Sequence, residues 1–190
     1  MRNFFLGFIL GALAIPAAGF LYIHFGHPPV AVADQPFLLE KQIVRGPLHA
    51  RIGKEMPTSA PIATSDENLV AGAKIYREQC AACHGLQGQP SAFAAHMYPY
   101  VPQLWASHRK GVVGVSDDPP GETYWKVENG IRLTGMPAFG KLLSQTEMWQ
   151  VSLLLANADK PIPYAAMNLV KEPLDFAPHT APGAPASQSH

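Results

Sequence analysis

The sequence has few cysteines, few charged side chains and no excess of either charge. Only two of its 190 residues are cysteine, which excludes a framework of several disulfides. Fourteen basic residues balance fourteen acidic ones, so no basic field indicates a nucleic-acid partner, and none is expected. The alternation of apolar and polar residues that predicts β-strands is nearly absent. Apolar residues nevertheless make up 47% of the chain, and part of that excess lies in one N-terminal run.

This run, residues 4–25, contains no Asp, Glu, Lys or Arg. As a helix it would be about 33 Å long, enough to cross the hydrocarbon core of a bilayer. With Arg2 ahead of it, residues 1–3 are expected in the cytoplasm, and the remainder on the periplasmic side of a bacterial inner membrane. A cleaved secretory signal is the alternative, with cleavage near Ala33 and a soluble periplasmic product. The length of the run favours the retained anchor or uncleaved signal.

Two segments outside the middle of the chain are rich in proline. Residues 26–63 read as a linker with a possible short helix at 36–45, capped by Asp34 and stopped by Gly46. The apolar side chains of that helix, which could pack on the membrane surface or on the main domain, are Phe37, Leu38, Ile43 and Val44. Residues 161–190, rich in Pro and Ala, predict a disordered tail.

The compact part is predicted at residues 64–160, as three helices joined by long loops. Capping signals and helix-ending glycines set the expected helix ends. These end residues are Thr64 with Glu67 for the first helix, Asp118 and Gly130 for the second, and Ser144 with Glu147 for the third. Three helices leave little core for such long loops, which indicates that the loops pack on a bulky, flat, apolar cofactor.

Both cysteines lie together, as Cys80 and Cys83, with His84 directly after the second. One helical turn places two thiols within reach of two vinyl groups on the same porphyrin edge and holds the histidine under the iron. This C-x-x-C-H pattern predicts one covalently attached haem c, with His84 as an iron ligand. A redox dithiol and a zinc site are weaker alternatives, because the motif follows a helix rather than a strand and only isolated histidines remain as further zinc ligands.

A second iron ligand is predicted at Met136, in a loop whose neighbours restrict its backbone. Gly135 permits close backbone approach, and Pro137 stiffens the chain and removes a hydrogen-bond donor. A histidine–methionine pair raises the reduction potential and closes the iron, which favours electron transfer over oxygen chemistry. An ordinary core methionine is the plain alternative, and His96 and Met97 are the other candidate ligands, although they lie close to the haem-attachment turn.

Two stretches resemble the class I cytochrome c family. "AGAKIYREQCAACHG" is similar to the family's N-terminal helix and haem-binding turn, and "TGMPAFGKLLSQTEMWQVSLLLAN" is similar to its methionine loop and C-terminal helix. The resemblance covers about residues 65–158. It implies an all-α class I cytochrome c fold, with few helices and long loops around one covalent haem, preceded by the N-terminal transmembrane helix.

The resemblance also implies a role for each site residue. Cys80 and Cys83 would carry the thioethers, His84 would be the proximal iron ligand through its Nε2, and Met136 would be the distal ligand. The carbonyl of Pro102, in "VPQL", would accept the Nδ1 proton of His84 and so fix the tautomer and the ring plane. The metal ligands are then His84 and Met136.

Other positions carry expectations about packing and about the haem propionates. Gly72 and Tyr76 are expected to cross the last helix near Trp149, with the glycine allowing the two helices to touch closely. Trp105 and Arg132 are the candidates for contacts to the propionates, which the resemblance alone does not assign.

The sequence thus predicts a membrane-tethered electron carrier rather than an enzyme. Its expected partners are redox proteins, namely an oxidase, a dehydrogenase or another cytochrome, and no small-molecule substrate is expected. One alternative is a haem enzyme, a peroxidase or an oxygen-handling site with an open distal position. The other is a haem-bearing subunit of a larger oxidase or dehydrogenase, which the anchor would suit equally.

Overall fold

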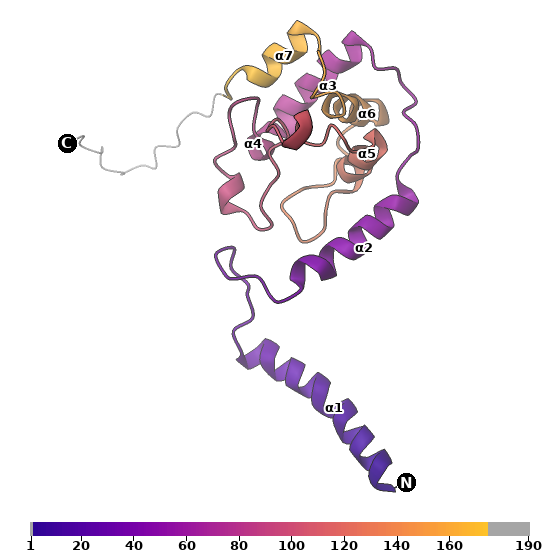
Figure 1. Ribbon diagram of the computed structural model, residues 1–190, viewed down its shortest axis with the longest axis vertical. Helices are drawn as coiled ribbons and strands as arrows, with labels where there is room; N and C mark the ends of the chain where they lie inside the picture. Colours follow the sequence, from indigo (N-terminus) through magenta and orange to yellow (C-terminus); the bar gives the residue numbers. More distant parts are fainter. Residues whose placement is uncertain (1, 175–190) are drawn as a thin grey trace, which may run out of the picture. The chain divides into compact units, whose positions relative to one another are not determined.

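A computed structural model of the protein describes residues 2–174, and within them it is all-α with no β-strand, as predicted (Figure 1). The α-helices are α1 Arg2–Phe25, α2 Glu40–Glu55, α3 Asp66–Gln79, α4 Ala81–His84, α5 Pro120–Asn129, α6 Gln145–Leu155 and α7 Tyr164–Lys171. Two 3-10 helices, Ala94–His96 and Arg109–Gly111, lie in the loops. The chain divides into two compact units, one that ends at Arg51 and one that begins at Ile52.

Helix α1 is the apolar N-terminal run. Its segment Asn3–Phe25 is long and apolar enough to cross a membrane by length and composition, and none of it is buried within the protein. Pro16 lies inside the helix without ending it. Membrane-spanning helices tolerate such a proline, because neighbouring groups can satisfy the backbone carbonyl that the missing N–H leaves free.

Helix α2 differs from the short helix predicted at residues 36–45. It begins at Glu40, continues through Gly46 and Pro47, and ends only at Glu55. Asp34 does not cap it, because its carboxylate accepts two backbone N–H groups of the preceding turn, each at 2.8 Å. The predicted start, cap and stop of this helix were therefore wrong.

Tertiary contacts explain why α2 extends past its local stop signals. Ile52 is only 2% exposed in the second unit. The indole Nε1 of Trp125 donates a 3.0 Å hydrogen bond to the Glu55 carboxylate, so the last turn of α2 is held by a residue far along the sequence. The burial of Ile52 and this partly buried indole hydrogen bond outweigh the modest helix penalty of a glycine and the larger one of a proline.

In the second unit, α3 crosses α6 at very short range. A Cβ added at Gly72 would lie 2.3 Å from the backbone carbonyl oxygen of Gln150, so only glycine fits at this crossing. The predicted close contact is confirmed. Aromatic rings pack beside this crossing: the ring of Tyr76 lies edge-on to Trp105, and Trp149 stacks on Tyr124 with ring centroids 4.4 Å apart.

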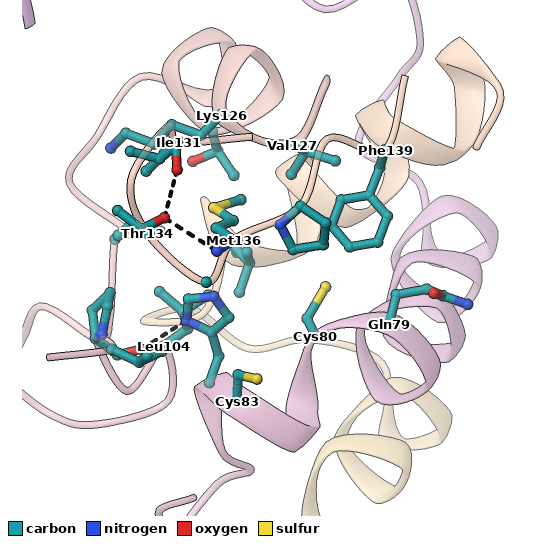
Figure 2. A pocket seen from close by; sticks show the side chains of 18 of the residues that line it. Gln79, Cys80, Cys83, Leu104, Lys126, Val127, Ile131, Thr134, Met136 and Phe139 are labelled. Carbon is teal, nitrogen blue, oxygen red and sulfur yellow. Dashed lines mark hydrogen bonds between the residues drawn. The ribbon is translucent and has the colours of Figure 1, made fainter. Parts of the chain in front are cut away.

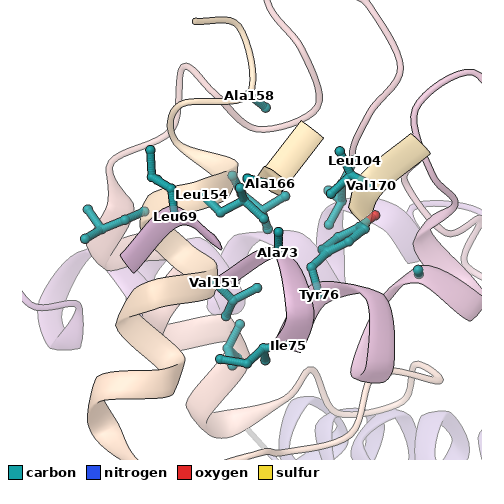
Figure 3. Close-up of a cluster of buried hydrophobic side chains, with 14 of the residues drawn as sticks. Leu69, Ala73, Ile75, Tyr76, Leu104, Val151, Leu154, Ala158, Ala166 and Val170 are labelled. Atoms are coloured by element: carbon teal, nitrogen blue, oxygen red, sulfur yellow. The ribbon is translucent and has the colours of Figure 1, made fainter. Parts of the chain in front are cut away.

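The core of this unit lies where α3, α6 and α7 meet (Figure 3). Ala73 and Tyr76 come from α3, Val151 and Leu154 from α6, and Val170 from α7, and each is fully or almost fully buried. The hydroxyl of Tyr76 donates a 2.6 Å hydrogen bond to the carbonyl of Gly85, which joins the core to the turn that follows α4. The core therefore fixes the position of the Cys-x-x-Cys-His segment.

The helix ends follow the predicted capping signals with small shifts. Ser144 and Glu147 form the expected capping box of α6. The N-cap of α3 is Ser65 rather than Thr64. That of α5 is Pro119 rather than Asp118, whose carboxylate instead lies 3.6 Å from the Lys126 ammonium. Gly130 ends α5 as predicted, with a φ of 64°.

Helix α7 lies inside the segment 161–190 that was predicted to be disordered, and for Tyr164–Lys171 that prediction was wrong. Ala166 and Val170 on one face of the helix are fully buried, which supplies the apolar contact that a disordered tail lacks. The rest of the predicted tail, residues 175–190, lies outside the described residues.

One arginine holds the chain that follows α7. The Arg77 guanidinium on α3 donates to the carbonyls of Leu169 at 3.1 Å and Pro173 at 2.7 Å, and also to that of Glu172. These carbonyls belong to the last turn of α7 and the residues after it, where helical partners are lacking. Arg77 therefore acts as a C-terminal cap supplied by another helix.

Candidate functional site

The two cysteines lie at a break between two helices. Helix α3 ends at Gln79, and the short helix α4 carries Cys83 and His84. The backbone N–H groups of Cys83 and His84 both bond to the carbonyl of Cys80, at 3.1 and 2.9 Å. Gly85, with a φ of 72°, then ends the turn in a conformation that favours glycine. Cys80, Cys83 and His84 are thus presented by one rigid turn.

The stretch of residues 101–104 holds this turn from the other side. The Nδ1 of His84 lies 2.8 Å from the carbonyl oxygen of Pro102, the contact that the resemblance implies. The backbone N–H of Leu104 donates to the carbonyl of His84 at 3.1 Å. A carbonyl can only accept, so Nδ1 carries the proton and Nε2 keeps its lone pair. Burial lowers the pKa of His84 below its ordinary 6.5, and the bond to Pro102 raises it in part.

The thiols and the imidazole open into a cavity of about 230 Å³ in the second unit (Figure 2). Most of its wall is apolar and comes from α5, α6 and the loops between the helices. Its main apolar lining side chains are Val115, Val127, Ile131, Phe139, Val151 and Leu155. In Figure 2, Cys80 and Cys83 lie on one side of this cavity, and Met136 with Thr134 lies on the opposite side.

Met136 belongs to a loop, residues 130–139, that we call the Met136 loop. Thr134 holds its middle: the hydroxyl donates to the carbonyl of Ile131 at 2.6 Å and accepts from the backbone N–H of Met136 at 3.1 Å. The loop closes on α5 where the N–H of Phe139 donates to the carbonyl of Val127 at 2.9 Å. These bonds keep the Met136 side chain at the cavity wall.

The electrostatics of the cavity favour neutral groups. Burial, with a smaller effect of neighbouring Cys83, raises the pKa of the Cys80 thiol to about 12. Thiol–disulfide exchange needs a thiolate near neutral pH, so this environment argues against the redox-dithiol interpretation. Lys126, the cation in the cavity wall, is 2.7 Å from the Glu122 carboxylate and is paired also with Asp118.

The other candidate residues are distributed unevenly around the cavity. Met97 lines it, and its terminal methyl would lie 2.3 Å from a Cβ added at Gly135. His96, Trp105 and Arg132 are absent from the lining among residues 2–174; Trp105 packs in the core and Arg132 is exposed. Over the same residues, no group of three His, Cys, Asp or Glu side chains is placed to hold a metal ion by itself.

Sequence reasoning missed four polar residues in or beside this site. Thr134 stands two positions before Met136, where a hydroxyl readily bonds the local backbone, so "TGM" contained a usable signal. Lys126 and Glu122 are four residues apart on a helix, a spacing that predicts their ion pair but not its place beside the cavity. Thr123 is a buried polar residue in the cavity wall with no sequence signal.

Comparison with known families supports a c-type cytochrome. Residues 67–153 match the family model described as cytochrome c oxidase, cbb3-type, subunit III. The match runs from the first turn of α3 to the last turn of α6 and so includes the Cys80–His84 turn, most of the cavity lining and the Met136 loop. No curated protein and no solved structure matches the chain.

Proposed function

We propose that this chain, whose residues 67–153 form a c-type cytochrome domain, transfers electrons between redox proteins through one haem c. Thioether bonds to Cys80 and Cys83 would attach the haem, and His84 and Met136 would bind its iron. When bound, haem c supplies an iron centre that takes up and releases a single electron. The residues described below hold and shield that centre.

One observation carries the proposal. The two thiols, an imidazole with a fixed tautomer and a thioether all line the same apolar cavity. This donor set fits haem c, whose attachment needs paired thiols and whose iron could be held by the His84 nitrogen and the Met136 sulfur. Carboxylates, which would favour a hard metal ion, contribute nothing to the cavity wall described in residues 2–174.

His84 is prepared for iron binding before any haem arrives. The carbonyl of Pro102 holds the Nδ1 proton, which leaves Nε2 as the nitrogen available to a metal. Because burial lowers its pKa, the ring is neutral at physiological pH and needs no deprotonation to act as a ligand. The same bond fixes the ring plane, so little reorganisation accompanies a change of charge at the site.

The Met136 loop closes the other side of the cavity. Its thioether is a soft, neutral ligand that favours the reduced iron and raises the potential. Thr134 holds the Met136 backbone, and Phe139, only 6% exposed, anchors the end of the loop. A closed iron of this kind suits electron transfer, whereas a haem enzyme needs an open position for its substrate.

Helix α1 completes the proposal as a membrane anchor, with the second unit on the periplasmic side of a bacterial inner membrane. Its length and apolar composition support the anchor, and Arg2 at its start favours the stated orientation. A tether of this kind confines the carrier to the plane of the membrane and raises its concentration near membrane-bound partners.

The experiment that tests the function compares two methionine variants of the holoprotein. Produced in a host that attaches haem, the wild type should gain the mass of one haem and show a weak near-infrared sulfur-to-iron band when oxidised. Met136→Ala should lose the band and bind carbon monoxide rapidly when reduced. Met97→Leu, the matched control in the same cavity, should retain the band and stay closed to carbon monoxide.

Three results would overturn the proposal. A colourless protein at the bare polypeptide mass would remove the haem altogether. Loss of the band in Met97→Leu but not in Met136→Ala would transfer the ligand role to Met97. Rapid carbon monoxide binding by the wild type itself would replace the carrier with a haem enzyme whose distal position is open.

A second candidate function follows from the description of the matched family, which names a subunit of an oxidase. In that case the chain would deliver electrons as a fixed member of a membrane-bound complex rather than as an independent carrier. Mild detergent extraction of native membranes separates the two candidates. A subunit would migrate with oxidase activity through size exclusion, and a carrier would migrate alone.

A further inference from the structure

A cluster of exposed apolar side chains stands at the start of α2, in the unit that ends at Arg51. Its members are Phe37, Leu38, Leu39, Ile43 and Val44, which are 54, 79, 55, 62 and 41% exposed. A soluble surface normally shows such side chains singly, and a contiguous group marks a contact with a partner or a membrane. We call residues 37–48 the juxtamembrane segment.

The helical part of this segment is amphipathic. Ile43 and Pro47, four residues apart, lie on one face of α2, and Leu39 directly precedes the helix. Lys41 and Arg45 also stand four residues apart, but they are shifted by two positions, or about 200°, from the apolar row. A helix with an apolar face and basic residues on the other is typical of a segment that lies in the surface of a bilayer.

The charge of the segment points to an anionic surface. Lys41 and Arg45 are both exposed, and Glu40 is the one acidic side chain in residues 37–48. The Glu40 carboxylate is already engaged by the backbone N–H of Phe37, at 2.8 Å. Long basic side chains can bury their apolar stems while their charged ends reach lipid phosphates. The apolar and the basic residues of the segment can therefore contact the same lipid surface.

The distance along the chain keeps the segment near the membrane. Helix α1 ends at Phe25, and Phe37 follows twelve residues later, a separation that spans at most about 43 Å of extended chain. Asp34 shortens this connection further, because its carboxylate closes a turn on two backbone N–H groups. Tethering raises the effective concentration of lipid around the segment, so even weak intrinsic affinity suffices for binding.

We propose that the juxtamembrane segment binds the outer surface of the bilayer, with Phe37, Ile43 and Val44 among the acyl chains and Lys41 and Arg45 on anionic headgroups. The inference rests on the proposed anchoring by α1. Ile52, where the haem-binding unit begins, follows the segment by four residues of the same helix. The lipid contact therefore fixes the start of that unit at the membrane surface and limits its reach toward partners.

Spin labels on single introduced cysteines test the proposal in the full-length holoprotein, because Cys80 and Cys83 are then consumed by the haem. The protein is reconstituted alone in nanodiscs that contain phosphatidylglycerol. Collisions of each label with oxygen, which concentrates in lipid, are compared with collisions with a water-soluble nickel chelate. The labelled variants are Ile43→Cys and Val44→Cys, with Gln42→Cys as the matched neighbour on the polar face.

Labels at Ile43 and Val44 should collide severalfold more with oxygen than with nickel, and the label at Gln42 should show the reverse preference. The double substitution Lys41→Gln/Arg45→Gln should diminish the oxygen preference at Ile43, as should replacement of the anionic lipid by phosphatidylcholine. Equal nickel access at all three positions would overturn the proposal. Shielding of Ile43 from both reagents would also overturn it, because the segment would then pack on protein.

A separate label tests whether α1 crosses the bilayer, independently of the juxtamembrane segment. Ala14→Cys lies in the middle of α1 and should show strong oxygen preference in the same nanodiscs if α1 crosses the bilayer. Oxygen preference at Ala14 without any at Ile43 would contradict the surface contact alone. Nickel access at Ala14 would contradict the anchor, and with it the premise of the surface contact.

Discussion

The two sides of the proposed haem cavity are built in different ways. The His84 side, residues 80–86 and 101–104, follows directly on α3, and Ala81, Leu86 and Leu104 on it are each less than 10% exposed. The Met136 loop contacts the core mainly at its ends, and Leu133 in its middle is 82% exposed. The first side shares the stability of the core, whereas the second depends on a few local hydrogen bonds. We therefore expect the His84 side to open only when the whole unit unfolds, and the Met136 loop to open locally while the core stays folded.

The largest effect is expected from removing the thiols on the His84 side. Cys80→Ser/Cys83→Ser leaves no sulfur for thioether bonds, so the protein should lose all covalently bound haem. Denaturing gels stained for haem, together with the intact mass, measure this directly. His96→Gln is the control, because His96 lies outside the cavity lining among the described residues, and it should retain full haem. Covalent haem in the double variant would contradict the assigned attachment.

The next largest effect concerns the helix crossing that supports the His84 side. Gly72→Ala would place a Cβ 2.3 Å from the backbone oxygen of Gln150, and a packed backbone cannot move away easily. We expect the free energy of unfolding to fall by about 1–3 kcal/mol, the usual cost of overpacking a core. Denaturant titration of the holoprotein measures it.

Gly53→Ala provides the matched control for this substitution. Gly53 lies in α2, and no atom approaches within 4 Å of the position of its added Cβ. Alanine there should raise the free energy of unfolding by about 0.5–1 kcal/mol, because glycine loses more backbone entropy in a helix. A fall of equal size in both variants would show that the crossing at Gly72 has no special role.

A smaller and more local effect is expected on the other side of the cavity. Thr134→Val removes the hydroxyl that bonds the carbonyl of Ile131 and the N–H of Met136. The loss of about 1 kcal/mol of hydrogen-bond energy should loosen the loop without disturbing the core. Carbon monoxide should then bind the reduced protein faster than it binds the wild type, but more slowly than it binds Met136→Ala.

Two measurements on Thr134→Val, the denaturant midpoint and the rate of carbon monoxide binding, test whether the two sides of the cavity differ. Its denaturant midpoint should stay close to that of the wild type, whereas Gly72→Ala should shift the midpoint and leave carbon monoxide binding nearly unchanged. Thr134→Ser, which keeps the hydroxyl, should restore slow binding. If both readouts moved together in every variant, the two sides would belong to one cooperative unit.

Much of the site could be predicted from the sequence because its chemistry is local. Cys80, Cys83 and His84 occupy one turn, and the glycine and proline beside Met136 mark a constrained loop. The all-α class followed from helical periodicity and capping signals, and the capping box of α6 was predicted to the residue. Features of this kind depend on residues close together in the sequence, so contacts with distant residues change them little.

What could not be predicted depends on contacts between distant residues. The Pro-rich segment after residue 160 suggested disorder, yet α7 forms there because Val170 is buried and Arg77 caps its end. Pro163, one of the prolines of the predicted disordered tail, instead is the N-cap residue of α7. The extension of α2 past Pro47 likewise depends on its contact with Trp125, seventy residues away in sequence.

The smallest effect should come from the helix that supports both sides of the cavity, since α6 packs against α3 and α5. Hydrogen bonds from the Ser144 hydroxyl and backbone N–H hold the pKa of Glu147 below its ordinary 4.5. A carboxyl whose pKa is lower in the folded protein stabilises the fold above about pH 4.5, and this contribution disappears as the pH falls through the folded value. Glu147→Gln should therefore lower the free energy of unfolding at pH 7 by a fraction of a kcal/mol, because the group is exposed.

Denaturant titrations should show the difference from wild type shrinking below pH 4.5, with carbon monoxide binding unchanged throughout. A difference that stayed constant with pH would mean that shape, not charge, carries the cap, and a change in carbon monoxide binding would mean that the start of α6 reaches the Met136 loop.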